Sequence, residues 1–370
     1  MNHIISFIKK EIVLSLSGIL AICSCFLVYP DSHYKSYIDW HTIFILFCLM
    51  AVMAGFKDIG LFQYTGETLL KKIHSQRGVV CVLVFLCFLS SMFITNDVAL
   101  ITFVPLALLI LNMADMNHFL CYIITLMTIA ANLGSMLTPI GNPQNLYLYS
   151  VSGLSLGNFV VLMLPYTLVS AALLLICIFI RFPNTTLPSA FENTSNIMNV
   201  KRIVYYGILF LLCLFAIAKI CPIGILFAII LLAVVIDNRK LLQNIDYSLL
   251  LTFIFFFIFI GNMGRFPVFR NFLAEILEGH VTLVAVLSSQ IISNVPAALL
   301  LSGFIHDWNS LIIGTNLGGL GTLIASMASL ISYKQLAHNF PHKRGNYMLV
   351  FTIANIAFLI ILYGGFLLLC

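Results

Sequence analysis

Charged side chains are scarce in this chain of 370 residues. Aspartate, glutamate, lysine and arginine together make up 8% of it, whereas soluble domains carry about 25%. Hydrophobic residues make up 61% and the mean hydropathy is +1.09, so a soluble globular protein is excluded. The apolar runs are continuous and do not alternate with polar residues, which excludes a transmembrane β-barrel. The sequence therefore predicts a polytopic all-α membrane protein with about 10 to 11 membrane-spanning segments.

Other signatures are absent as well. The ten cysteines stand singly in apolar runs with no CxxC pair, so neither a disulfide framework nor a metal centre is predicted. The chain contains no His-Glu-x-x-His or Gly-x-Ser-x-Gly motif, which argues against an intramembrane enzyme. The net charge of +5 gives no support for nucleic-acid binding. We expect no cofactor other than a coupling ion, either Na⁺ or H⁺.

The two halves of the chain carry matching polar landmarks in the same order. Corresponding residues lie 207 positions apart early in each half, then 198 and finally 184. The pairs are Ile38-Asp39-Trp40 with Ile245-Asp246-Tyr247, Thr95-Asn96 with Ser293-Asn294, and Asn132-Leu133-Gly134 with Asn316-Leu317-Gly318. Because a shared order is harder to obtain by chance than any single match, we predict two structural repeats.

Each predicted repeat contains a helical hairpin and an interrupted helix. The first repeat is expected at 1–182, a linker with one helix at 183–217, and the second repeat at 218–370. The expected hairpins lie at 79–112 and 281–305, and the interrupted helices at 119–148 and 309–333. Each hairpin arm holds about 11 to 16 apolar residues, too few to span comfortably, and the arms meet at a polar tip. We therefore interpret both hairpins as re-entrant.

The basic residues indicate an orientation. With an inverted second repeat and a cytoplasmic N-terminus, 14 of the 18 lysines and arginines fall on the cytoplasmic side, as the positive-inside rule expects. This set includes Lys9, Lys10, Lys71 and Lys72, whereas Lys219 falls outside. Two amphipathic stretches, 59–73 and 266–277, are expected to lie in the membrane interface. We therefore expect a multi-pass protein of the plasma membrane with two inverted repeats.

Irregular backbone at membrane depth is tolerated only where it is buried in protein or lines a cavity. Both hairpin tips and both interrupted helices are such places, and paired interruptions in two halves point to a transport site. Half-helix N-termini would attract an anion there, and Asn, Ser and Thr oxygens would hold a small cation. The candidate substrate-binding residues are Thr95, Asn96, Asn132, Thr138, Asn142, Ser293, Asn294, Asn316 and Thr322.

Asp97 is the only acidic residue well inside an apolar stretch. An ionisable group at membrane depth is costly and points to a proton or cation carrier. A plain N-cap of the outgoing hairpin arm is the alternative, and the two roles are compatible. Asn96 and Asn294, at the two tips, are expected to contact substrate or ion, with capping as the alternative. Gly134 and Gly318 have close helix packing as their alternative role.

At these residues the sequence resembles the ion transporter superfamily, which includes arsenite permeases, NhaD-type sodium/proton antiporters, citrate transporters and divalent anion/sodium symporters. Asn96-Asp97 and the segment from Asn132 to Gly141, NLGSMLTPIG, are similar to the arsenite-permease pattern. Ser293-Asn294 is similar to half of the Ser-Asn-Thr tips of the dicarboxylate symporters. The resemblance implies an inverted-repeat fold, one hairpin from each side of the membrane, and a homodimer that works by an elevator-like movement.

The resemblance also implies two cation sites. The first site would use Ser91, Thr95, Asn96 and the backbone near Gly141. The second would use Ser289, Ser293, Asn294 and the backbone near Ala325. Asp97 is a further candidate ion-coupling residue. The sequence departs from the family pattern in three places. The first tip reads Thr-Asn-Asp instead of Ser-Asn-Thr, which makes proton coupling more attractive, and the second tip reads Ser-Asn-Val. The second interrupted segment, Thr322-Leu-Ile-Ala-Ser326, lacks the proline of Thr-Pro-Ile-Gly.

These features together predict a secondary transporter that moves a small anion, or an oxyanion such as arsenite, across the plasma membrane by alternating access. The coupling ion is expected to be H⁺ or Na⁺. No lysine or arginine lies within the predicted core, so binding would depend on half-helix N-termini and on Asn, Ser and Thr, which suits weak or neutral substrates. The alternative is a cation/proton antiporter with Asp97 as the exchange site.

Overall fold

The computed structural model describes residues 11–70, 73, 75–186, 199–218 and 220–369. Over these residues the chain is helical, and its β-structure is limited to one isolated bridge between Ser75 and Thr186. Eight of the described helices are long and apolar enough to cross a membrane, or nine if the bent pair Pro267–Leu277 and Val281–Ile292 counts as one span. The predicted polytopic all-α membrane protein is therefore confirmed, with fewer full-length helices than the 10 to 11 segments expected.

The α-helices follow one another along the whole described chain, with short 3₁₀ turns between some of them. In order they are α2 (Ile12–Leu27), α3 (Tyr34–Tyr37), α4 (Trp40–Asp58), α5 (Leu61–Leu70), α6 (Gln76–Ile94), α7 (Asn96–Met113), α8 (Leu120–Ser135), α9 (Pro143–Ser152), α10 (Leu156–Arg181), α11 (Val200–Ile217), α12 (Ile223–Asn238), α13 (Tyr247–Gly264), α14 (Pro267–Leu277), α15 (Val281–Ile292), α16 (Asn294–Ser302), α17 (Trp308–Leu317), α18 (Met327–Asn339) and α19 (Arg344–Leu369).

The matching tripeptides of the two halves mark the same structural feature. Asp39 is the N-cap of α4, and its carboxylate accepts a hydrogen bond of 3.2 Å from the backbone N–H of Thr42. Asp246 is the N-cap of α13 and accepts one of 2.9 Å from the N–H of Leu249. A carboxylate at this position satisfies an otherwise unpaired N–H and interacts favourably with the helix dipole. Each tripeptide therefore starts a long apolar helix.

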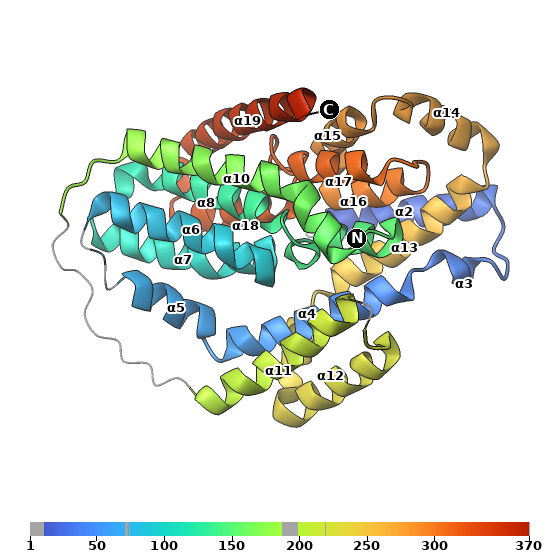
Figure 1. Cartoon of the computed structure of the whole chain (residues 1–370), viewed down its shortest axis with the longest axis horizontal. Helices are drawn as coiled ribbons and strands as arrows, with labels where there is room; N and C mark the ends of the chain where they lie inside the picture. Colours follow the sequence, from blue (N-terminus) through green and yellow to red (C-terminus); the bar gives the residue numbers. More distant parts are fainter. Residues whose placement is uncertain (1–10, 71–72, 74, 187–198, 219, 370) are drawn as a thin grey trace.

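The helices form two groups that lie against one another. The scaffold group consists of α2, α4, α11, α12 and α13, in which α4 packs on α11, α12 and α13, and α2 packs along α13. The hairpin group consists of α6 to α9 and α15 to α18, covered by α10 and α19. Figure 1 shows α4, α11 and α12 along one edge of the molecule and α10 and α19 along the opposite edge. The helices of both halves are interleaved, since α7 packs on α18 and α9 packs on α16 and α17.

The two hairpins differ in length. In the first, α6 and α7 have 19 and 18 residues and both pass the length criterion for a membrane span. The expectation of short arms is therefore wrong here, because α6 begins at Gln76, before the apolar run, where Ser75 caps the helix by accepting a hydrogen bond from the N–H of Gly78. In the second hairpin α15 has 12 residues, within the expected range, and α16 has 9, shorter than expected. Figure 1 shows α6 and α7 towards one end of the molecule and α15 and α16 nearer its middle.

Both amphipathic stretches are helices. The stretch 59–73 contains α5, and the stretch 266–277 coincides with α14, which meets α15 at an angle of 114°. The linking helix predicted between the repeats is α11. Part of the expected linker, 187–198, lies outside the described residues, as do Lys9, Lys10, Lys71, Lys72 and Lys219, which entered the orientation argument.

Candidate transport site

Both hairpin tips contain a residue with the same unusual backbone conformation. Thr95 has φ 68° and ψ 148°, and Ser293, 198 positions later, has φ 75° and ψ 154°. Positive φ is strained for residues other than glycine, and such residues cluster at functional sites. The sharp turn places Asn96 and Asn294 at the first position of the outgoing arms, where both are buried. The predicted tips are therefore real turns, and they have matching geometry.

The predicted interruptions are also present. The first lies between α8 and α9, with a 3₁₀ turn at Pro139–Gly141. The second lies between α17 and α18. Gly141 donates its N–H to the carbonyl of Thr138 at 3.3 Å, and Ala325 donates to the carbonyl of Thr322 at 3.2 Å. Both the donors and the acceptors are 184 positions apart in the sequence. The same turn therefore occurs at corresponding positions of the two segments.

Two asparagines connect the halves across the centre of the hairpin group. The Oδ1 atom of Asn132 accepts hydrogen bonds of 3.0 Å from Asn96 Nδ2 and from Ser326 Oγ. Its Nδ2 atom donates to Gly319 O and to Ser329 Oγ, both at 3.4 Å. The predicted residues Asn96 and Asn132 are thus in direct contact, and Asn132 also binds the interrupted segment of the other half.

The second asparagine makes the reciprocal contact. Asn316 donates to Asn145 Oδ1 at 2.7 Å, and this pair is related to Asn132 and Ser329 by the same offset of 184 residues. All four side chains are nearly or fully buried. Each half therefore anchors the interruption of the other through one buried amide, as two related repeats would produce.

Hydroxyl groups fix each interruption to its own hairpin. Thr138 donates to the carbonyl of Met92, and Thr322 donates to the carbonyl of Gln290 at 3.1 Å. Thr138 is half-buried, whereas Thr322 is exposed. Asn142 is buried and donates to Ser135 Oγ at 2.6 Å. The predicted threonines thus position the backbone of the interruptions with their side chains.

The predicted cation-site residues surround the tips. Ser91 and Ser289 are fully buried, and their hydroxyls donate to carbonyls of their own helices. At the second tip, Asn294 donates its backbone N–H to Ala325 O at 2.9 Å, and the hydroxyl of Ser293 also reaches that carbonyl, at 3.4 Å. The structure therefore brings Ser289, Ser293, Asn294 and Ala325 together, while their roles as ligands stay predictions.

Glycines let the hairpins approach the interrupted helices. A Cβ atom on Gly134 would lie 2.0 Å from Phe88 O and 2.7 Å from Ser91 Oγ, and one on Gly318 would lie 2.6 Å from Ser289 Oγ. A Cβ on Gly141 would lie 2.1 Å from Ser135 O. The packing role left open for Gly134 and Gly318 is thus present in the structure. It brings each buried serine against an interrupted helix.

A cavity of about 480 Å³ separates the first hairpin tip and the first interruption from the scaffold group. From the predicted set it is lined by Thr95, Asp97 and Asn142. The second tip and the second interruption do not line it. The Oδ1 atom of Asp97 is buried and has no hydrogen-bond partner among the described residues. Asp97 is therefore placed at a cavity wall with unused hydrogen-bonding capacity.

Sequence reasoning missed the charges on the opposite wall of this cavity. The scaffold group contributes Lys57 and Asp58, at the end of α4, and Asp246, at the start of α13. With Asp97, the charged side chains on the described lining are one lysine and three aspartates. Residues at helix ends look like ordinary caps in a sequence, and only the tertiary arrangement brings them opposite Asp97.

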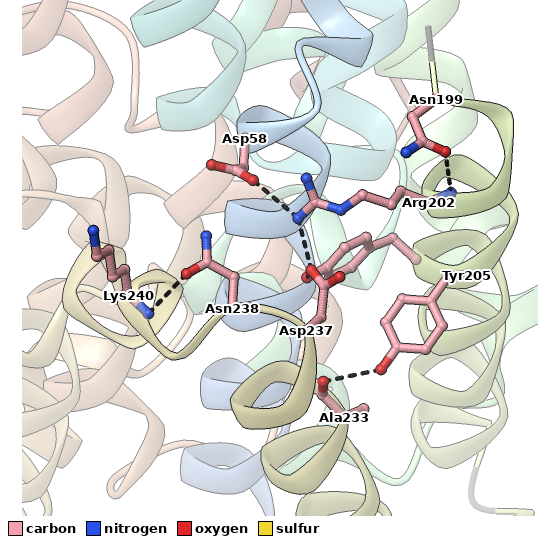
Figure 2. A network of polar contacts seen from close by, with 9 residues as sticks. Asp58, Asn199, Arg202, Tyr205, Ala233, Asp237, Asn238 and Lys240 are labelled. Carbon is pink, nitrogen blue, oxygen red and sulfur yellow. Dashed lines mark hydrogen bonds and ion pairs between the residues drawn. The ribbon is translucent and has the colours of Figure 1, made fainter.

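An ion-pair network lies beside the cavity, where Asp58 lines its wall. Arg202, on α11, bonds to Asp58 Oδ2 at 3.0 Å and to Asp237 Oδ2, near the end of α12, at 2.6 Å, as Figure 2 shows. The hydroxyl of Tyr206 also donates to Asp237 Oδ2, at 2.7 Å. Arg202 therefore ties three scaffold helices together beside the cavity, and it holds one of the aspartates that line it.

Gln144 is a further residue of this region that the sequence did not single out. It lies in the first turn of α9, directly after Pro143, and its side chain is 1% exposed. Neither Nε2 nor Oε1 has a hydrogen-bond partner among the described residues. No side chain caps this helix N-terminus. A buried, uncapped helix start beside an unpartnered amide is costly unless a ligand or water satisfies it.

Comparison with known proteins gives the family. The sequence model of the CitMHS family, described as "Citrate transporter", matches residues 4–308. An uncharacterised transporter of Methanocaldococcus jannaschii is 35% identical over 332 residues, covering 88% of each chain. The inner membrane protein YbiR of Escherichia coli is 30% identical over 318 residues, covering 84% of each chain. A silicon efflux transporter of Oryza sativa is 29% identical over 170 residues, which is 45% of this chain and 34% of that one. The chain belongs to the CitMHS citrate transporter family, within the ion transporter superfamily, and is a multi-pass membrane transporter.

Proposed function

We propose that this transporter moves a small, weakly acidic oxyacid or its oxyanion, such as arsenite or silicic acid, across the plasma membrane in exchange or symport with H⁺. The movement is of the elevator type, with the hairpin group sliding against the scaffold group in a homodimer. The observation that carries the substrate class is the charge of the cavity wall: three aspartates and one lysine. Of these aspartates, Asp58 is paired with Arg202. Asp97 and Asp246 have no ion-pair partner among the described residues. A multiply charged anion such as citrate would be repelled there, whereas a neutral hydroxylated molecule would not.

The polar groups around the first tip suit such a molecule. Its hydroxyls can donate to the unused oxygen of Asp97 and can accept from the uncapped N-terminus of α9 beside Gln144. Asn142 and Thr95, which line the same cavity, offer further amide and hydroxyl contacts. A site built from hydroxyl and amide groups can discriminate strongly by hydrogen bonding, because a ligand without matching groups leaves buried polar atoms unpaired. The name of the rice relative, a silicon efflux transporter, agrees with this class.

Asp97 supplies the coupling in this proposal. It follows the strained tip residue Thr95 in the first turn of α7, lines the cavity, and keeps one carboxylate oxygen unpartnered among the described side chains. A carboxyl group in this position can carry a proton across as the hairpin group moves, because only its protonated form is easily taken through a low-dielectric barrier. The positive-inside orientation, with a cytoplasmic N-terminus, belongs to the same proposal.

A cation/proton antiporter is the second candidate, and the acidic cavity supports it. Three aspartates around one lysine would also attract Na⁺, with Asp97 exchanging the ion for a proton. The serines and asparagines of the two tips would then be cation ligands. The two candidates share Asp97 but differ in what drives the proton movement, which makes them separable by a single assay.

The test uses the purified full-length chain in liposomes that contain a pH-sensitive dye. Arsenite, silicic acid, citrate, Na⁺ and Li⁺ are added in turn, and internal pH is followed. The proposal expects proton movement driven by the oxyacids, lost in Asp97→Asn and retained in Asp115→Asn, an exposed carboxylate just beyond the other end of α7. Proton movement driven only by Na⁺ or Li⁺ would instead establish the antiporter, and movement driven by citrate alone would contradict the substrate class.

A further inference from the structure

The two interrupted segments adopt the same turn with different sequences. The first contains Pro139 and Pro143, whereas the second, from Thr322 to Ser326, contains no proline. Nevertheless both segments have the i to i+3 backbone hydrogen bond described above. In both, a threonine of the segment also donates its hydroxyl to a backbone carbonyl on the first arm of the hairpin in the same half. Proline restricts the unfolded and alternative conformations of a turn. Something else must therefore hold the second turn.

The side chain of Gln290 restrains the second interrupted segment. Its Nε2 atom donates to the carbonyls of Gly318 and Leu320, at 3.0 and 2.9 Å, and its Oε1 atom accepts from the N–H of Thr322 at 2.9 Å. One side chain thus satisfies three backbone groups of the unwound segment. Buried or half-buried backbone groups without such partners cost free energy. The side-chain amide therefore provides hydrogen-bond partners that a continuous helix would provide, and it restrains the segment as a proline would.

The first hairpin has no equivalent of this contact. The residue 198 positions before Gln290 is Met92, whose thioether cannot donate a hydrogen bond. Its backbone carbonyl accepts from Thr138, as that of Gln290 does from Thr322. The halves therefore share the backbone contact, and they differ in the side chain of the arm and in the prolines of the segment.

Gly321 is adapted to this side chain. It has φ +104°, a conformation that L side chains rarely adopt, and a Cβ atom there would lie 2.3 Å from Gln290 Oε1. The segment continues to Ala325 and Ser326, which bond to the tip residue Asn294 and to Asn132. The position of the second tip relative to the central asparagine thus depends on the geometry that Gln290 fixes.

We propose that Gln290 is a positioning residue for the second half of the transport site, where it replaces the prolines of the first interrupted segment by hydrogen bonds to the segment's backbone. Gln290 contacts no ligand itself in this role. It holds residues 318–322 so that Ser293, Asn294 and Ala325 keep the arrangement that substrate or ion binding requires. The consequence for transport rests on the proposed function, whereas the consequence for the segment's mobility does not.

The experiment measures mobility without any substrate. Amide hydrogen exchange of the purified full-length protein is compared between wild type and Gln290→Met, which copies the first hairpin. We expect exchange in 316–326 to become about tenfold faster or more, because the three hydrogen bonds from the Gln290 side chain to the backbone of this segment are lost. Exchange in 132–142 should stay unchanged. The control is Gln335→Met on α18, whose Oε1 atom has no partner among the described groups.

A second substitution tests the equivalence with proline. Leu323 lies where the first segment has Pro139, at the second position of the same turn, and its N–H makes no backbone hydrogen bond within the described loops. Leu323→Pro should therefore restore slow exchange in the Gln290→Met background. Unchanged exchange in Gln290→Met, equal acceleration in both interrupted segments, or no restoration by Leu323→Pro would each overturn the proposal.

Transport then distinguishes positioning from general folding. In liposomes with arsenite as the probe, Gln290→Met should raise KM about fivefold to tenfold with little change in the maximal rate, and Leu323→Pro should reverse the rise. A fall in the maximal rate at constant KM would contradict positioning. If wild-type protein moves neither arsenite nor silicic acid, the proposed function fails while the exchange result on 316–326 still decides whether Gln290 holds the segment.

Discussion

The hydrogen bonds around Asn132 predict a large loss of stability on truncation. Asn132→Ala removes the acceptor for two buried donors, Asn96 Nδ2 and Ser326 Oγ, both at 3.0 Å, and also two weaker contacts at 3.4 Å to Gly319 and Ser329. A buried polar group left without a partner costs about 1 to 3 kcal/mol. Since the serine hydroxyl can rotate towards another acceptor, we expect a total loss of about 3 kcal/mol.

The assay is thermal unfolding of the purified protein in detergent, followed by intrinsic fluorescence. A loss of about 3 kcal/mol should lower Tm by about 6 °C, taking about 2 °C per kcal/mol for a chain of this size. Asn355→Ala provides the matched control. Asn355 is equally buried, but its Nδ2 donates only to Phe351 O within α19, and its Oδ1 has no partner among the described groups. Its truncation orphans no donor.

The comparison of the two variants decides the outcome. The reasoning predicts that Asn132→Ala lowers Tm by several degrees more than Asn355→Ala does. Asn316→Ala, which breaks the reciprocal bond to Asn145 at 2.7 Å, should behave like Asn132→Ala. If the three variants unfold at the same temperature, the two buried asparagines do not hold the halves together and the reasoning is refuted.

Three further predictions concern packing, buried polarity and pH. Gly134→Ala places a Cβ 2.0 Å from Phe88 O, so α6 and α8 must separate, with a loss of at least about 1 to 3 kcal/mol measured as a fall in Tm. Gln144→Leu removes an unpartnered buried amide, so Tm should rise while oxyacid uptake in liposomes falls. The Arg265 guanidinium lowers the pKa of Asp31. The ion pair therefore stabilises the fold above the ordinary carboxyl pKa, and this stabilisation is lost as the pH falls and Asp31 becomes protonated. In a plot of Tm against pH, Asp31→Asn should therefore show a smaller fall in Tm at acidic pH.

The packing and buried-polarity predictions each have a control variant. Gly207→Ala, at a glycine with no atom near the added Cβ, should leave Tm unchanged or raise it slightly through helix propensity. Gln335→Leu separates a general effect of removing a glutamine from one specific to Gln144. A Gly134→Ala protein as stable as Gly207→Ala, a Gln144→Leu protein that transports normally, or an Asp31→Asn protein with an unchanged acid limb would each contradict the corresponding prediction.

The sequence predicted the central landmarks because they are local. A polar tip between two apolar runs leaves the chain few conformations, and Thr95 and Ser293 turn as expected, with positive φ. The tripeptides around Asp39 and Asp246, which are matching landmarks in the sequence, occupy corresponding places, because both aspartates cap helices. The sequence assigns Asn96 and Asn132 to one site but does not predict the hydrogen bond between them, which joins α7 and α8. Features that one stretch of chain determines by itself could thus be read before the fold was known.

The remaining features depend on distant parts of the chain. Lys57 and Asp246 look like ordinary helix-end residues, and only the packing of α4 and α13 against the first tip places them on the cavity wall. Gln290 is one polar residue on a short apolar helix, and its three backbone partners lie about 30 residues further on. The first hairpin was predicted too short because Gln76 and Arg77 extend the helix beyond its apolar part. Hydrophobic patterns alone do not contain this information.

Asp97 provides the most direct test of the account. Internal pH is recorded in liposomes that contain wild type, Asp97→Asn or Asp115→Asn while an arsenite or silicic acid gradient is applied across the membrane. The account predicts oxyacid-driven proton movement for wild type and Asp115→Asn, and none for Asp97→Asn at equal protein content and equal Tm. Proton movement of wild-type size in Asp97→Asn would contradict the claim that this buried carboxyl carries the coupled proton.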